Sequence, residues 1–134
     1  MPEHKIGSNY SLAQITGAFH ADPPADAGDL NSILHRGEEV VALCLRHKYN
    51  PEPHEVWVGA DPAAAPWGER LAQCKGKKTV PLFYAPRGRS FYEFKGQHLV
   101  TGDTTDPKEL AARRAPGPLS RIVFLEATAP AASP

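Results

Sequence analysis

Two arginines that flank a glycine, Arg87 and Arg89, are the residues of this chain best suited to binding an anion. They follow Pro86 between two β-prone runs, and this pattern predicts a tight turn with two guanidinium groups at its tip. Guanidinium groups donate paired hydrogen bonds to phosphates or to the edge of guanine, and Gly88 lets a ligand approach the backbone. A solvated hairpin turn is the alternative interpretation, and the sequence leaves both open.

Aromatic side chains crowd the neighbouring positions and could stack on a flat ligand, which is worth roughly 1–3 kcal/mol per base. Burial preference assigns Phe83, Phe91 and Phe94 to the core. Successive side chains on the strand that begins at Phe91 point to opposite faces, however. Phe91 and Phe94 therefore cannot both be cleanly buried. Four other aromatic residues are the candidates for a binding pocket, and a core role is the alternative for each: Trp57, Trp67, Tyr84 and Tyr92.

The charges are unevenly placed although the net charge is zero. Residues 1–39 hold six acids and two bases, whereas residues 70–98 hold seven bases and one acid. A local excess of six positive charges attracts a polyanion at moderate salt, and Lys77 and Lys78 are candidate phosphate ligands within it. The alternative is a solvated strand edge that lysine and arginine protect from aggregation.

The motifs of common enzymes are incomplete. The pair His54-Glu55 lacks the second histidine of a zinc protease, and Gly76–Thr79 lacks the first glycine and the helix of a P-loop. Three acids could hold a cation, but a capped helix start explains them more simply: Asp103, Asp106 and Glu109. We therefore predict no catalytic residues, no metal site and no cofactor.

Length and composition favour one globular domain, because 134 residues with 41 % apolar and 22 % charged residues can bury one core. No run of about 18 apolar residues is present, and no apolar segment typical of a secretory signal follows the N-terminus. Two widely spaced cysteines predict neither a zinc site nor a disulfide framework. The expected location is the cytoplasm.

We expect a flexible lead-in over residues 1–8, one domain over 9–127, and a flexible tail or linker stub over 128–134. The predicted helices span Leu12–Phe19, with a Ser11/Gln14 capping box, Trp67–Cys74 and Pro107–Arg114. The predicted strands are Glu39–Arg46, His54–Gly59, Thr79–Tyr84, Phe91–Phe94, Gln97–Thr101 and Leu119–Ala127, with turns at Arg36-Gly37 and Lys95-Gly96. Ser32–Leu34 is expected to be only a short apolar contact.

These strands follow one another too closely for βαβ crossovers, except around Trp67. The pattern predicts an α+β fold: a small, curved, mostly antiparallel sheet or partly open β-barrel with two or three short helices at its ends.

The order of these motifs resembles small SRA-like modules that read modified DNA and accompany HNH nucleases in modification-dependent restriction enzymes. The likeness covers most of Tyr10 to Glu126 and rests on one run of positions: Val80, Leu82-Phe83, Gly88, Phe91-Tyr92, Phe94 and Gly96. It implies a PUA-like β-barrel and a role in restriction or defence. The chain departs from these modules in having no HNH segment and a Pro/Ala-rich stretch, 60–68, where they are Gly-rich.

The first hypothesis is a non-catalytic nucleic-acid-binding module that recognises a modified base or backbone, in DNA rather than RNA, with a nuclease or other effector as a further partner and no membrane. Arg87, Arg89, Lys77 and Lys78 would hold phosphates. Trp57, Trp67 and Tyr92 would line the pocket, with Asp61 at the edge of an extruded base.

The second hypothesis is a protein-interaction or regulatory domain of a larger assembly. The third hypothesis is a small hydrolase or nucleotide-processing enzyme, for which no catalytic set can be named.

Overall fold

Seven strands and three helices form within the part of the chain that the computed structural model describes, which is residues 6–22, 32–47, 54–60, 65–86, 88, 91–113 and 118–128. The strands are β1 (Asn9–Tyr10), β2 (Ser32–Arg36), β3 (Glu39–Arg46), β4 (Glu55–Gly59), β5 (Thr79–Ala85), β6 (Tyr92–Thr104) and β7 (Leu119–Ala127). The helices are α1 (Leu12–Ala18), α2 (Ala65–Ala72) and α3 (Pro107–Ala112). Three predicted site residues lie outside the described residues: Asp61, Arg87 and Arg89.

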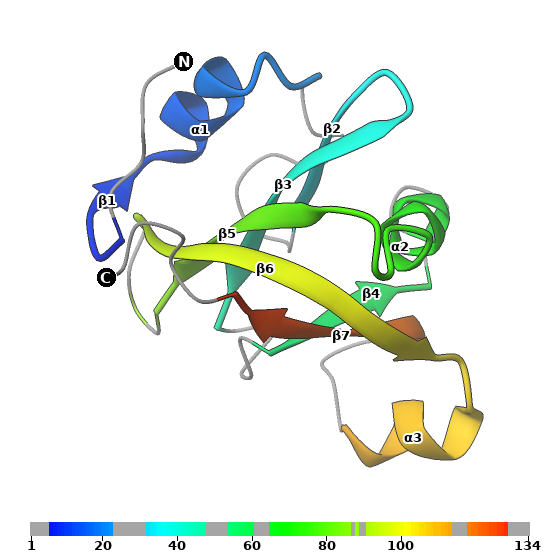
Figure 1. Cartoon of the computed structure of the whole chain (residues 1–134). Helices are drawn as coiled ribbons and strands as arrows, with labels where there is room; N and C mark the ends of the chain where they lie inside the picture. The colour runs from blue at the N-terminus through cyan, green and yellow to red at the C-terminus, as the bar shows by residue number, and fades with distance from the viewer. Residues whose placement is uncertain are drawn as a thin grey trace.

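The strands join in the order β2-β3-β5-β6-β7-β4, and β1 pairs with the start of β6. All pairs are antiparallel except β3 with β5, which are parallel and are connected through β4 and α2. The sheet curls into a half-barrel, with β6 crossing it as one long, bent strand (Figure 1). The predicted α+β class and the curved, mostly antiparallel sheet are therefore confirmed, as is the crossover around Trp67.

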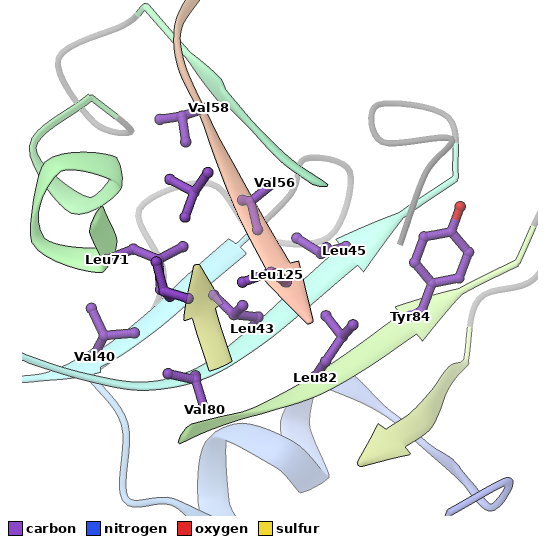
Figure 2. Packing of buried hydrophobic residues seen from close by; sticks show 12 residues of the cluster. Val40, Leu43, Leu45, Val56, Val58, Leu71, Val80, Leu82, Tyr84 and Leu125 are labelled. Carbon is purple, nitrogen blue, oxygen red and sulfur yellow. The ribbon is translucent and has the colours of Figure 1, made fainter. Parts of the chain in front are cut away.

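Both faces of the central strands are buried, because α2 covers one face and α1 covers the other. Leu43 and Leu45 of β3 join α2 in the larger core cluster, whose side chains converge between β3, β5, β7 and α2 (Figure 2). Cys44, which points the opposite way, joins Ile15 of α1 in a second cluster. A strand buried on both faces reads as a continuous apolar run, which is why Glu39–Arg46 could be predicted from sequence.

Local capping signals fix the starts of α1 and α3 as predicted, at Leu12 and Pro107. The backbone N–H of Gln14 donates to Ser11 Oγ at 3.1 Å, and the backbone N–H of Ser11 donates to Gln14 Oε1 at 2.8 Å. Asp106 Oδ1 accepts from the backbone N–H of Lys108 at 3.0 Å, and Pro107 opens α3. Each cap satisfies amide groups that the first turn of a helix leaves without an intrahelical partner.

The predicted turn at Lys95-Gly96 is wrong, because β6 continues through it. Gly96 faces Leu82 while Phe94 already faces Phe83, so Lys95 is one extra residue in β6. Gly96 has φ +92°, a value that favours glycine, and the irregularity is a β-bulge. A bulge bends a strand without reversing it, and this bend lets β6 pair with β5 along its first half and with β7 along its second.

Two further expectations need correction. Phe91 does not join the core: it is 54 % exposed, whereas Tyr92 and Phe94 are buried. The alternation along β6 can bury only one set, and α1 covers the face that carries Tyr92 and Phe94. The apolar contact at Ser32–Leu34 is the start of a full strand, β2, because the turn at Gly37 returns the chain antiparallel onto β3.

Candidate nucleic-acid interface

Three strand ends meet at one edge of the sheet. β3 and β5 run parallel, so both finish at this edge, where the backbone N–H of His47 donates to the carbonyl oxygen of Ala85 at 3.0 Å. β6 starts beside them, since Tyr84 pairs with Glu93. We call this edge the hairpin end and define it by six residues, of which the acid is paired with Lys95 at 2.8 Å: Arg46, His47, Tyr84, Phe91, Tyr92 and Glu93.

Arg46 and Tyr92 form a guanidinium–phenol pair on the α1 side of the hairpin end. Arg46 Nη1 donates to the Tyr92 hydroxyl at 3.2 Å, and its guanidinium carbon lies 5.6 Å from the centre of the Tyr92 ring. The pair reaches across β5 at Ala85, the residue that faces Arg46 in the parallel register. Because Ala85 carries only a methyl group, the Arg46 side chain can extend over it to Tyr92. The contact with Tyr92 fixes a cationic group at the end of β3.

His47 and Tyr84 form a second pair on the other side of the sheet. His47 Nδ1 and the Tyr84 hydroxyl share a hydrogen bond of 3.0 Å, and their rings meet edge to face at 6.4 Å. Tyr84 lies at the margin of the larger core cluster with its hydroxyl directed away from the leucines and valines (Figure 2). The phenol is thus apolar at its base and polar at its tip, where the strand ends.

The loop between β5 and β6 leaves from this edge and carries the predicted arginines. Gly88 is exposed with φ +77°, a value that favours glycine, and a Cβ added there would meet nothing within 4 Å. The sequence from Tyr84 to Tyr92 contains no Asp or Glu. The open backbone at Gly88 supports the predicted close approach of a ligand, and the local sequence supplies only positive charge.

In the rest of the basic stretch, residues 70–98, ion pairs with acids neutralise part of the positive charge. The ion pairs join Arg70 to Glu38 at 3.3 Å, Lys78 to Glu39 at 3.6 Å and Lys95 to Glu93 at 2.8 Å. Five bases of the stretch are described (Arg70, Lys75, Lys77, Lys78, Lys95), and these three acids reduce their combined charge from +5 to +2. The excess counted along the sequence is therefore not a continuous basic surface.

The two predicted lysines lie at the opposite end of β5 from the hairpin. Lys77 is exposed, while Lys78 Nζ donates to the carbonyl oxygen of Val40 at 2.7 Å. Seven strand residues at about 3.3 Å each put roughly 20 Å between the two ends of β5. Lys77 and Lys78 therefore do not share one phosphate site with the described residues of the hairpin end.

The three residues expected to line one aromatic pocket lie in different surroundings. Trp57 is 7 % exposed, and its Nε1–H donates to Glu55, which also binds Arg113 beside α3. Trp67 packs against the larger core cluster, and its ring stacks on His35 with centroids 3.5 Å apart. Tyr92 is 1 % exposed and belongs to the cluster under α1. Tyr84 and Tyr92 both lie at the hairpin end, but on opposite faces of the sheet.

Sequence reasoning did not select Arg46 and His47. Arg46 is the last residue of a strand buried on both faces and His47 follows it. The carboxyl ends of such strands are where functional residues gather in parallel sheets. That signal depends on knowing that β3 and β5 run parallel, because an antiparallel pair would place Arg46 at the far end from the hairpin.

The three acids considered for a cation have other roles. Asp106 caps α3, Asp103 pairs with Arg121, and Glu109 pairs with Arg113. Within the described ranges, no group of three or more His, Cys, Asp or Glu side chains is placed to hold a metal ion. The helix-start interpretation of Asp106 is confirmed.

Glu55 is a structural anchor between β4 and α3. Arg113 donates to it through Nε at 2.8 Å and Nη2 at 3.1 Å, and Trp57 Nε1 donates at 3.0 Å. Burial raises the pKa of the Glu55 carboxyl, but the hydrogen bonds from Arg113 and Trp57 outweigh burial and bring the pKa below its ordinary value near 4.5. The folded state therefore favours the ionised carboxylate.

We expect the contribution of Glu55 to stability to be complete above pH 4.5 and to be lost as the pH falls through its lower folded pKa, because unfolded Glu55 binds a proton more readily. Glu55→Gln should cost about 1–3 kcal/mol near pH 7 and flatten the acid dependence of unfolding. Urea unfolding of the wild type and the variant, at pH 7 and at a pH below 4.5, measures the difference in the free energy of unfolding. Glu38→Gln, in an exposed ion pair, is the control and should cost less than about 1 kcal/mol; equal losses in the two variants would contradict the account.

Comparison of the chain with protein-family models, with curated proteins and with solved structures found no match. The resemblance to SRA-like modules and a PUA-like barrel thus stays a prediction. Among the described residues, every helix is too short or too polar to cross a membrane.

Proposed function

We propose that this chain is a non-catalytic nucleic-acid-binding domain that holds phosphates at the hairpin end. The observation that carries the proposal is that the Arg46–Tyr92 and His47–Tyr84 pairs lie on the two faces of one sheet edge. The loop that follows β5 at this edge contains Arg87 and Arg89 in its sequence and no acid. Backbone phosphates supply most of the affinity in nucleic-acid complexes, and arginine is their preferred forked donor.

The hairpin end suits a phosphate chain for a further reason. Within each pair, the tyrosine hydroxyl and its partner side chain hold each other in place before any ligand arrives: Tyr92 with Arg46, and Tyr84 with His47. Preorganised groups lose less conformational entropy on binding than free side chains do. Recognition of a modified base or backbone, in DNA rather than RNA, is the finer prediction from sequence and requires a separate test with modified oligonucleotides.

The test is binding of the purified chain to fluorescent oligonucleotides at about 50 mM and about 200 mM salt. We expect affinity to fall steeply with salt, because phosphate contacts release counterions. Arg87→Ala/Arg89→Ala should weaken binding and reduce the slope of log affinity against log salt by about 1.8 on duplex DNA, or about 1.4 on a single strand. Oligonucleotides with methylated, hydroxymethylated or phosphorothioate groups form the further arm.

The matched control is Lys75→Ala/Lys108→Ala, which removes the same charge from two exposed positions away from the hairpin end. This variant should bind as the wild type does. Absence of binding at the lower salt concentration would reject the proposal and favour the alternative, in which the domain docks an acidic protein partner. Equal weakening by both double variants would show that net charge, not the hairpin end, determines binding.

A further inference from the structure

His98 is a histidine buried inside the half-barrel. It is 3 % exposed and is the one buried polar side chain among the described residues. It pairs with Val80 of β5 and lies two residues before Val100 on β6, so it shares a face with these two members of the larger core cluster. Such surroundings favour a neutral imidazole, because a charge moved from water into an apolar interior costs free energy.

One hydrogen bond determines where neutral His98 carries its proton. Nδ1 lies 3.1 Å from the carbonyl oxygen of Gly96, and a carbonyl oxygen only accepts, so the Nδ1–H donates. A second proton would therefore bind at Nε2. Burial lowers the pKa of His98 below its ordinary value of 6.5, the hydrogen bond to Gly96 opposes this shift, and repulsion from His54 adds to it.

The other charged groups on the neighbouring strands are paired elsewhere or point away from His98. Glu126 of β7 faces the residue that follows His98, so its side chain lies on the opposite face of the sheet. Among the described residues, His54 is thus the titratable group whose charge acts on His98, and no carboxylate pairs with it. Three charged groups are held in ion pairs of their own: Lys78 on β5, Lys95 on β6 and Glu55 on β4.

His98 lies at the end of the ladder between β6 and β7. Its partner in this ladder, Ala127, is the last residue of β7. Beyond the pair, Thr128 donates to the carbonyl oxygen of Gln97 through its backbone N–H at 3.1 Å and through Oγ1 at 3.0 Å. The end of a strand opens at a lower free energy than its middle, so water reaches His98 most readily by separation of these residues.

We propose that His98 is an acid-sensitive switch: the neutral imidazole keeps the end of β7 paired with β6, and protonation at Nε2 releases it. Release exposes the imidazolium to water, which hydrates the charge and the new N–H. The switch does not depend on nucleic-acid binding, so failure of the proposed function leaves it standing.

The direction of the pH dependence follows from the lowered pKa of buried His98. The open form takes up the proton near pH 6.5, whereas the closed form takes it up only at a lower pH. The closed state is therefore fully favoured above pH 6.5 and loses stability as the pH falls toward the pKa of the folded protein. One histidine changes the opening equilibrium constant by at most about tenfold per pH unit.

NMR of the isotope-labelled wild type between about pH 8 and about pH 4.5 tests the switch. We expect the His98 ring to titrate below pH 6.5. Hydrogen exchange over the same range should show the protection factors of the Thr128 and Leu125 amides falling below pH 6.5, by up to about tenfold per pH unit. These amides donate to Gln97 and His54, on the two sides of the end of β7.

His98→Asn keeps a donor that can bind the Gly96 carbonyl but cannot take up a proton. It should remove the fall in protection between about pH 7 and about pH 5. His20→Asn is the matched control, because His20 is exposed and its φ of 51° is one that asparagine tolerates. This control should keep the pH dependence of the wild type.

Two results in the wild type would overturn the switch: a His98 ring that titrates at or above pH 6.5, or unchanged protection of Thr128 and Leu125 as the pH falls. A wild-type pH dependence in His98→Asn would assign the effect to another group and would also overturn it. The wild-type titration decides the question even if His98→Asn does not fold.

Discussion

Replacing Phe83 by alanine is expected to lower the free energy of unfolding by about 3–5 kcal/mol. Phe83 is fully buried on β5, and its ring lies 4.9 Å from that of Phe94, measured between centroids. Tyr10 and Phe19 meet the same ring edge to face at 5.9 and 6.0 Å. Truncation removes the group that joins α1 and β1 to the sheet, and the cavity left under α1 adds to the loss.

Phe91→Ala is the matched control, because it makes the same chemical change eight residues away on an exposed side chain. We expect it to change stability by no more than about 0.5 kcal/mol. Urea unfolding followed by circular dichroism measures both variants. Similar losses in the two variants would show that Phe91 is packed, which would contradict its exposed position in the fold.

Gly68→Ala should lower stability by about 1–3 kcal/mol, although alanine normally stabilises a helix interior relative to glycine. Gly68 is buried where α2 approaches β4, and an added Cβ would lie 2.5 Å from Val58 Cγ1 and 2.8 Å from Cγ2. Valine is stiff at χ1 and cannot turn aside cheaply. The methyl group would therefore push α2 away from the concave face of the half-barrel.

The control for this prediction is Gly17→Ala in α1, where an added Cβ meets nothing within 4 Å. This variant should gain up to about 1 kcal/mol from helix propensity. Thermal or urea unfolding should thus give opposite signs for one chemical change. Val58→Ala should make the Gly68→Ala change less harmful, as a double-mutant cycle reports. A stabilising Gly68→Ala would show that α2 does not approach β4 so closely.

Local signals determine the parts of the fold that could be predicted from sequence. The apolar run Glu39–Arg46, the capping box at Ser11 and the proline that opens α3 each depend on residues within a few positions. The continuity of β6 could not be predicted, because Lys95-Gly96 has the same composition in a turn and in a β-bulge. Which one forms depends on the pairing of β6 with β5 and β7, which is a property of the whole sheet.

The candidate site was predicted less well for a related reason. The hairpin arginines and the neighbouring tyrosines were selected from composition, but Arg46 and His47 required the parallel pairing of β3 with β5. The charge excess was overestimated because Glu38 lies 32 residues from Arg70 in sequence and 3.3 Å from it in space. Trp57 and Trp67 were chosen by residue type alone. Tertiary packing directs Trp57 Nε1 to Glu55 and stacks Trp67, a residue of α2, on His35 of β2.

The central claim is that nucleic acid binds at the hairpin end, and amide chemical-shift mapping by NMR tests it most directly. The isotope-labelled chain would be titrated with an oligothymidine of about 12 nucleotides at about 50 mM salt. The account predicts that the largest shifts fall on residues 45–47 and 84–92, while α3 and the β2–β3 turn stay unchanged. Shifts centred on α3 or on Lys75 to Lys78, or no shifts at saturating oligonucleotide, would contradict it.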